Sequence, residues 1–290
     1  MNRRTTPWPA NGGRRKPRPR KRFGQHFLEA AWVSKLLACI NPSPRDLFLE
    51  IGPGTGQLTL PLARAGALIV AVEIDRDLAD TLRPTVPSTV SVVTGDILRQ
   101  DLREVLPRSG SSHPTRLVRV VGNLPYNIST PILGHLIHTQ QRATCFVDAT
   151  LMLQREVADR VVARPGSRNY GPLAILTRVA ADARLVLSLP PGAFRPPPKV
   201  RSAVVSLSFR PSPVAIADPT VFERLVRGVF TRRRKTILNA LGPVMSQVSH
   251  TTASGLLDRA DIAADRRPAT LDLPELARLA DGLSKPPPTP

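Results

Sequence analysis

Leu47-Phe48-Leu49-Glu50-Ile51-Gly52-Pro53-Gly54-Thr55-Gly56 joins a short apolar run to three glycines at alternate positions. The apolar half predicts a buried strand. The glycines predict a tight loop after it, because a residue without Cβ lets the backbone approach a ligand closely. A helix that begins after such a loop offers free backbone N–H groups to an anionic group. The stretch therefore predicts a strand, a loop and a helix with a ligand site at the turn.

Three further apolar runs extend this unit into an alternating α/β pattern. Residues 67–72, 90–93 and 117–121 are predicted strands, and residues 30–40 and 58–64 have helical apolar spacing. Each strand ends in a polar or glycine-containing segment, as in the ligand crevice at the carboxyl edge of a doubly wound sheet. We expect an α/β fold in which helices cover both faces of a parallel sheet.

The glycine loop comes close to the fingerprint of nicotinamide enzymes without completing it. Gln57 stands where that fingerprint has its third glycine or alanine, which weakens the dehydrogenase interpretation. Glu73, nineteen residues beyond Gly54, is placed to accept hydrogen bonds from two ribose hydroxyls, although it could be a solvated carboxylate. Asp96 follows the next predicted strand and could accept the amine of a cofactor adenine, or else cap a helix from Ile97 onward.

Asn123-Leu124-Pro125-Tyr126 follows the strand predicted for residues 117–121. An Asn side chain and a neighbouring carbonyl can accept both hydrogens of an exocyclic amine, while a Tyr ring stacks on the attached base. Proline fixes the turn through its restricted φ. An adenine amine is a poor nucleophile, so such a site must act by positioning it. We predict methylation of an adenine amine by these four residues, with Phe194 against the other face of the base or, alternatively, in the core.

The charge of the chain predicts a polyanionic partner. Its 290 residues carry 41 Lys and Arg against 22 Asp and Glu, a formal net charge of +19, which favours nucleic acid. Residues 1–22 hold nine basic side chains and no acid, so we expect a disordered RNA-gripping arm; their prolines oppose the alternative of a transit peptide. The run Arg232-Arg233-Arg234-Lys235 predicts phosphate contacts, although four consecutive cations can also form a solvated face.

Several classes of site and location are not expected. Cys39 and Cys145 lack CxxC spacing, which predicts neither a disulfide framework nor a zinc site and favours a reducing compartment. His135 and His138 lie three positions apart with no third ligand nearby, so no metal site is expected. No membrane helix is expected, because no apolar run reaches about 18 residues.

Six motifs follow one another along the chain: Lys21-Arg22-Phe23-Gly24-Gln25-His26-Phe27-Leu28, the glycine loop, Asn123 to Ile128, Met152-Leu153-Gln154-Arg155-Glu156-Val157, Phe194-Arg195-Pro196-Pro197-Pro198-Lys199-Val200 and Arg233-Arg234-Lys235-Thr236. Together they resemble the ribosomal RNA adenine dimethyltransferases, from about Lys21 to about Leu279. The likeness is greatest to the branch that dimethylates two adjacent adenines in the 3′-terminal hairpin of 16S rRNA.

The resemblance implies a class I S-adenosylmethionine-dependent methyltransferase, with a seven-stranded Rossmann-like sheet and a small all-helical C-terminal domain. It implies that the cofactor is held by His26, Leu28, Gly52, Gly54, Glu73, Asp96 and Asn123. In this assignment Glu73 holds the ribose, Asp96 the adenine, and Asn123 touches cofactor and target together. The family usually has Asn where this chain has His26. A backbone contact would survive that change, whereas a side-chain contact would become pH-sensitive.

The expected domains are the arm (1–22), a methyltransferase domain (23–210), a helical RNA-binding domain (211–283) and a disordered tail (284–290). The expected protein is a cytoplasmic monomer that binds neither membrane nor metal and acts on 16S rRNA in the immature small subunit. Two alternatives stay open. One is a 23S rRNA adenine methyltransferase of the macrolide-resistance type, and the other is a ribosome assembly factor whose transfer activity is dispensable.

Overall fold

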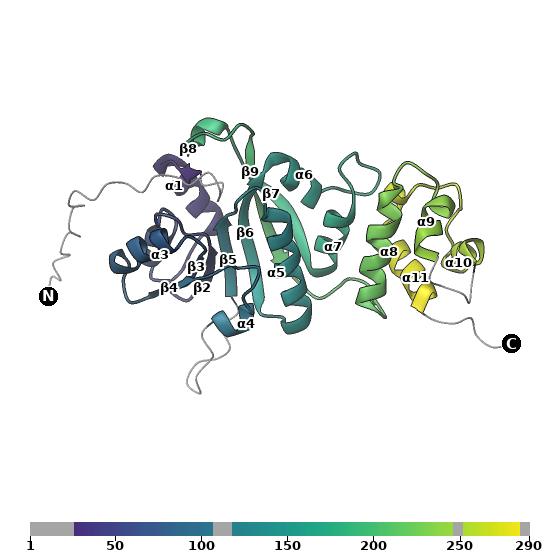
Figure 1. Ribbon diagram of the computed structural model, residues 1–290, viewed down its shortest axis with the longest axis horizontal. Helices are drawn as coiled ribbons and strands as arrows, with labels where there is room; N and C mark the ends of the chain where they lie inside the picture. Colours follow the sequence, from purple (N-terminus) through teal and green to yellow (C-terminus); the bar gives the residue numbers. More distant parts are fainter. Residues whose placement is uncertain (1–25, 107–117, 246–251, 285–290) are drawn as a thin grey trace.

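A seven-stranded sheet with the strand order β4-β3-β2-β5-β6-β9-β7 forms the centre of the larger part of the chain (Figure 1). The structure, a computed structural model, describes residues 26–106, 118–245 and 252–284. The strands of this sheet are β2 Leu47–Ile51, β3 Leu68–Glu73, β4 Val90–Thr94, β5 Val118–Asn123, β6 Phe146–Gln154, β7 Ala181–Leu189 and β9 Ser202–Phe209.

Helices cover both faces of the sheet, as expected (Figure 1). The helices of this part are α1 Ala30–Ile40, α2 Thr59–Arg64, α3 Arg76–Leu82, α4 Leu102–Val105, α5 Ser129–Ala143, α6 Arg155–Val161 and α7 Pro172–Ala180, with 3₁₀ turns at Arg83–Thr85 and Pro191–Ala193; a further 3₁₀ turn, Pro268–Thr270, lies in the C-terminal part. Successive strand residues point to opposite faces, so Phe48 packs with side chains of α1 and α2, whereas Leu49 packs with those of α4, α5 and α6.

The sheet is mixed, which corrects the expectation of a parallel one. Strands β4, β3, β2, β5 and β6 pair in parallel, and the α/β class is confirmed. Strand β9 runs antiparallel to both of its neighbours, β6 and β7. The reason is the connection between β7 and β9, which contains no crossover helix; a parallel return would need one.

A two-stranded antiparallel ribbon lies outside the main sheet. It consists of β1 Phe27–Leu28 and β8 Phe194–Arg195, and it pairs Phe27 with Arg195 and Leu28 with Phe194. The backbone N–H of Glu29 extends the ribbon by donating to the Ala193 carbonyl at 2.9 Å. The ribbon therefore joins the first described residues to a segment more than 160 positions later.

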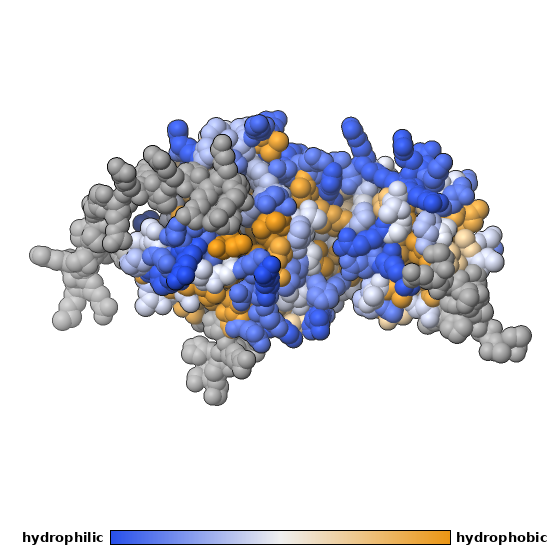
Figure 2. Space-filling model, in the orientation of Figure 1, coloured by the Kyte–Doolittle hydropathy of each residue, from blue (hydrophilic) through white to orange (hydrophobic). Residues whose placement is uncertain are grey.

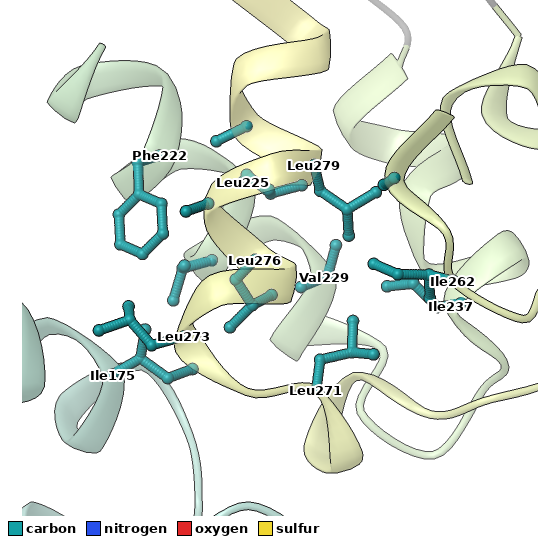
Figure 3. Packing of buried hydrophobic residues seen from close by; sticks show 14 of the residues in the cluster. Ile175, Phe222, Leu225, Val229, Ile237, Ile262, Leu271, Leu273, Leu276 and Leu279 are labelled. Carbon is teal, nitrogen blue, oxygen red and sulfur yellow. The ribbon is translucent and has the colours of Figure 1, made fainter. Parts of the chain in front are cut away.

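The C-terminal helices α8 Pro219–Thr231, α9 Ile237–Met245, α10 Ala253–Ala260 and α11 Leu273–Ser284 form a second core at one end of the molecule (Figure 1). Helix α8 begins after Asp218, whose side chain accepts from the N–H groups of Thr220 and Val221. Helix α7 shares this core, because Ile175 packs beside Leu273 (Figure 3). The hydroxyl of Tyr170 also donates to the Leu271 carbonyl at 2.9 Å. The helical core thus crosses the expected boundary at residue 210.

Some expectations fall on residues that the structure does not describe. The predicted basic arm, residues 1–22, and all but the first residue of the predicted tail, 284–290, lie outside the described ranges. Within the described ranges, no helix combines the length and the apolar character that a membrane span requires.

We predict that Gly122→Ala destabilises the sheet at its centre. A Cβ at Gly122 would stand 2.8 Å from the Ile51 carbonyl oxygen and 3.0 Å from Leu124 Cδ2, so the backbone of β2 or β5 must shift. We expect a loss of about 1–3 kcal/mol in the free energy of unfolding, measured by denaturant titration. Gly134→Ala in α5 is the matched control, because a Cβ there meets no atom within 4 Å. An equal effect of the two substitutions would contradict this account of the strand packing.

Candidate active site

A pocket of about 350 Å³ opens at the carboxyl ends of the central parallel strands. Its lining includes the glycine loop after β2, Glu73 at the end of β3, Asp96 after β4 and the segment from Asn123 to Ile128 at the end of β5. His26 and Leu28, from the β1 region, close its remaining side. The structure therefore brings five segments that are separate in the sequence to one place, as the predicted crevice requires.

The backbone conformation of the glycine loop leaves room for a ligand. Gly52 has a φ of 69° and Gly54 a φ of 56°, values that favour glycine. The N–H of Gly52 donates to the Val72 carbonyl at 2.9 Å, which fixes the start of the loop against β3. A Cβ placed on Gly52 would meet no atom within 4 Å, so its pocket side is open to a ligand.

Glu73 holds this loop and faces the pocket at the same time. Its Oε2 accepts from the Gly54 N–H and its Oε1 from the Asp75 N–H, both at 2.9 Å. The side chain is only 4 % exposed, and burial raises the pKa of Glu73, while these two hydrogen bonds oppose the rise. Each carboxylate oxygen can accept more than one hydrogen bond, so both can also receive ribose hydroxyls.

Asp96 occupies the turn that follows β4. Its Oδ1 accepts from the Leu98 N–H at 3.0 Å, and its Oδ2 lies 3.7 Å from Nε of Arg99. Asp96 therefore caps a turn and not a helix, because the next helix, α4, begins only at Leu102. Asp96 lines the pocket and remains the candidate acceptor for a cofactor adenine.

The Asn123 amide is oriented by a backbone carbonyl. Its Nδ2 donates to the His26 carbonyl oxygen at 2.7 Å. A carbonyl can only accept, so the amide nitrogen must face His26, and Oδ1 is left as an acceptor. This contact of His26 with Asn123 is made by the His26 backbone, so it does not depend on which side chain stands at position 26. The His26 ring is held separately, with Nδ1 at 2.8 Å from the Pro196 carbonyl oxygen.

Tyr126 is fixed on two sides. Its hydroxyl forms a 2.5 Å hydrogen bond with Oγ of Ser202, and burial raises the pKa of the Tyr126 phenol. The His26 ring stacks on the Tyr126 ring, with centroids 5.6 Å apart and planes inclined by 23°. Sequence reasoning found Tyr126 but missed Ser202, because nothing in the local sequence places β9 beside the turn after β5.

Phe194 does not reach the pocket. The pairing of β8 with β1 turns its ring into the core, where it is 1 % exposed and packs with Leu28. This placement favours the alternative of a core aromatic over a stacking role, since a ring so deeply buried offers no face to a base.

Sequence reasoning quoted Glu50 but gave it no role. Its side chain lines the pocket, is 2 % exposed, and has an oxygen, Oε2, without a hydrogen-bond partner among the described residues. With Glu73 and Asp96 it makes three carboxyl groups in the lining, and no Lys or Arg of the described chain joins them. In a chain with a net charge of +19, a pocket of this composition suits a cationic ligand.

The four cations that follow α8 are placed differently from one another. Arg232, Arg234 and Lys235 are exposed, whereas Arg233 is half-buried and donates to the Ser167 carbonyl at 2.9 Å. Figure 2 shows hydrophilic residues over much of the visible face in this part of the molecule. Three of the four predicted phosphate contacts are therefore accessible, and Arg233 ties the end of α8 to the loop before α7.

The two histidines considered as metal ligands have other partners. Nε2 of His135 lies 3.1 Å from the Gln100 carbonyl oxygen, and His138 contacts Arg142. No group of three His, Cys, Asp or Glu residues with the spacing of a metal site occurs in the described ranges.

Comparison with known proteins agrees with this geometry. Residues 17–278 match the family model described as ribosomal RNA adenine dimethylase. The chain is 42 % identical over 272 residues to a ribosomal RNA small subunit methyltransferase A of Pseudomonas syringae pv. tomato, covering 92 % of this chain and 96 % of that one. It is 38 % identical over 266 residues to the protein of that name from Xylella fastidiosa, covering 90 % and 95 %.

A dimethyladenosine transferase from Plasmodium falciparum has the same fold, with a TM-score of 0.72, 24 % identity and coverage of 88 % and 96 % of the two chains. The Rossmann-like sheet, its pocket and the match to the family model together define a class I methyltransferase that uses S-adenosylmethionine. Within that class, the chain belongs to the ribosomal RNA adenine dimethylase family.

The pocket fits this cofactor on its own chemistry. The open side of Gly52 gives room for backbone approach, the Glu73 carboxylate can receive ribose hydroxyls, and the unpartnered oxygen of Glu50 lacks a positively charged or donor group. The ribose of S-adenosylmethionine suits Glu73, and its ammonium and sulfonium can supply the positive charge that Glu50 lacks.

We predict that Glu73→Gln weakens cofactor binding at least tenfold. Both Glu73 oxygens accept backbone N–H groups, so the Gln NH₂ must face a donor and the loop at Gly54 must move. Isothermal titration calorimetry with S-adenosylmethionine measures the effect. Asp80→Asn is the control, since Asp80 is an exposed acid on α3 paired with Arg83, and the affinity of this variant should stay within about twofold. Unchanged binding in Glu73→Gln would contradict the assignment.

Proposed function

We propose that this chain transfers methyl groups from S-adenosylmethionine to the exocyclic amines of two adjacent adenines in the 3′-terminal hairpin of 16S rRNA. The observation that carries the proposal is the Asn123 amide, held by the His26 carbonyl beside the glycine loop. A site for a methyl donor and an acceptor for an amine thus meet at one point. The small-subunit names of relatives 38 % and 42 % identical over nearly the whole chain support this target over 23S rRNA.

In this proposal the residues that would hold the cofactor lie along the carboxyl edge of the sheet. Glu73 would accept the ribose hydroxyls, Asp96 would accept the adenine amine, and the loop from Gly52 to Gly54 would make room for the methionine part. When bound, the cofactor supplies an electrophilic methyl group on a positively charged sulfur. His26 and Leu28 close the pocket from the ribbon side and keep water from the transfer.

The target amine is positioned by acceptors. Asn123 Oδ1 and the Leu124 carbonyl each take one N–H of the amine, which turns its lone pair toward the methyl donor and favours a more tetrahedral nitrogen. Pro125 restricts the turn that carries both acceptors. The base stacks on the part of the Tyr126 ring that His26 leaves open, and Ser202 holds that ring in place. A general base is unnecessary, because the nitrogen becomes cationic on transfer and then loses its proton easily.

The RNA is held by phosphate contacts outside the pocket. Arg232, Arg234 and Lys235 are exposed just beyond the end of α8 and supply cations for the backbone of the hairpin. The adenine must leave its stack to enter the pocket, which costs less in a hairpin loop than in a duplex. We infer that residues 211–283 serve as the RNA-binding domain.

The setting of the reaction is also part of the proposal. The enzyme acts as a cytoplasmic monomer on immature small subunits, before the hairpin is enclosed by the finished ribosome. Its two cysteines, Cys39 and Cys145, are unpaired, which suits a reducing compartment.

We predict that Asn123→Ala lowers methyl transfer about a hundredfold or more and leaves RNA affinity within about threefold. The substitution removes an acceptor that acts on the reacting amine and leaves the phosphate contacts in place. Single-turnover transfer of labelled methyl groups and filter binding of the same RNA measure the two effects. An equal loss of methyl transfer and of RNA affinity would contradict the role of Asn123 as an acceptor for the target amine.

We predict the opposite pattern for Arg232→Ala combined with Arg234→Ala. RNA affinity should fall, and the slope of log affinity against log salt should become shallower by about 1 for each phosphate that is no longer neutralised. Arg233 is left intact because it bonds to Ser167. The control pair, Arg45→Ala with Arg64→Ala, removes the same charge from exposed positions outside the helical domain. If both pairs change the slope equally, the cations that follow α8 are not the phosphate ligands.

A further inference from the structure

The Glu50 carboxyl group is buried in the cofactor pocket, and its hydrogen bonds only partly offset the cost of removing it from water. It lies on β2 between Ala71 of β3 and Val121 of β5, two apolar neighbours in register. Its Oε2 has no hydrogen-bond partner among the described residues, and the neighbouring donor group that favours its ionised form comes from Thr59, at the start of α2. A buried carboxylate in such surroundings is costly unless it is protonated or meets a cation.

The groups around Glu50 make its ionisation harder. Burial raises the pKa of Glu50 to about 7; Thr59 lowers it in part, and the charge of Glu73 raises it further. The other ionisable side chains of the lining include Asp96, a further acid, and His26. No Lys or Arg of the described chain lines the pocket to act as a counter-ion. Near neutral pH the carboxyl group is therefore divided between its protonated and ionised forms.

We propose that Glu50 is a cofactor-binding residue that loses its proton when the cationic cofactor enters the pocket. The O–H bond of the carboxyl group breaks, the proton passes to the solvent buffer, and the negative charge that remains faces a cationic centre of the ligand. Binding of S-adenosylmethionine is then coupled to release of a proton. The inference rests on the cofactor of the proposed function and is independent of its RNA target.

The coupling follows from the opposite signs of ligand and pocket. S-adenosylmethionine carries two cationic centres, an ammonium and a sulfonium, and a positive charge within a few ångströms favours the ionised form of a carboxyl group. S-adenosylhomocysteine keeps the ammonium and lacks the sulfonium charge. Proton release with both ligands would assign the ammonium as the partner of Glu50, and release with S-adenosylmethionine alone would assign the sulfonium.

The test is isothermal titration calorimetry of the full chain with S-adenosylmethionine at pH 7, in phosphate and in Tris. These buffers differ in ionisation enthalpy, so the difference in heat counts the protons released. We expect the wild-type protein to release about half a proton more than Glu50→Gln, because a group with a pKa near 7 is half protonated there. From pH 6 to pH 8 the ratio of wild-type to variant affinity should rise about tenfold, since the ligand's own titration is common to both.

Two further measurements extend the test, and the first of them does not need the Glu50→Gln variant to fold. Thr59→Val removes the Thr59 hydroxyl and keeps the Thr59 backbone, which are the two groups that lower the pKa of Glu50; it should therefore increase the number of protons released by an otherwise wild-type pocket. The ligand-free wild-type protein should lose thermal stability relative to Glu50→Gln as pH rises from 6 to 8. The sign follows because a carboxyl group whose folded pKa is raised stabilises the fold while it is protonated, and that contribution is lost as pH passes the folded pKa.

The outcomes separate this inference from the proposed function. Cofactor binding with equal proton release in wild type and Glu50→Gln would overturn the role of Glu50 and leave the methyltransferase assignment intact. Failure of the wild-type protein to bind S-adenosylmethionine at all would instead overturn the cofactor of the proposed function.

Discussion

The parallel pairing of β2 with β5 is the constraint on which the site depends. Its register sets Ile51 opposite Gly122, so the residues that follow these two, Gly52 and Asn123, reach the sheet edge together. The pairing is close at this point because residue 122 has no Cβ, as the 2.8 Å from its ideal Cβ position to the Ile51 carbonyl oxygen indicates. A cofactor loop and an amine acceptor far apart in the sequence are thereby built as one unit, and the neighbouring strands β3 and β4 add Glu73 and Asp96 to it.

The charge of the whole chain and the charge of the pocket lining have opposite signs. The chain as a whole has a net charge of +19, which attracts RNA, yet the described lining of the pocket contains three carboxyl groups and no Lys or Arg. A basic exterior and an acidic pocket suit the two ligands, one a polyanion and the other a small cation. Two of the three acids also bond to the backbone of nearby turns, Glu73 to Gly54 and Asp96 to Leu98. Glu50 differs because its Oε2 has no hydrogen-bond partner among the described residues. For this reason we assign to Glu50 the proton that is released when the cofactor binds.

Much of the larger domain follows from local sequence, and the parts that do not follow depend on distant pairing. The apolar run at residues 47–51 and the helical spacing at 30–40 coincide with β2 and α1, because a short buried strand and an amphipathic helix each carry their own signal. The direction of β9 depends on how the chain returns from β7. The burial of Phe194 depends on the pairing of β8 with β1, and the Tyr126 partner Ser202 comes from a strand adjacent only in space. Glu50 was visible in the sequence, but its missing partner is a property of the folded pocket.

The segment from Asn123 to Tyr126 and the glycine loop together serve methylation of adenines in the small-subunit hairpin. The most direct test is to incubate the full chain with labelled S-adenosylmethionine and small ribosomal subunits that lack this modification, and then to map the modified nucleotides. The account predicts dimethyladenosine at two adjacent positions of the 3′-terminal hairpin of 16S rRNA. Cofactor binding without any label in that hairpin would contradict it.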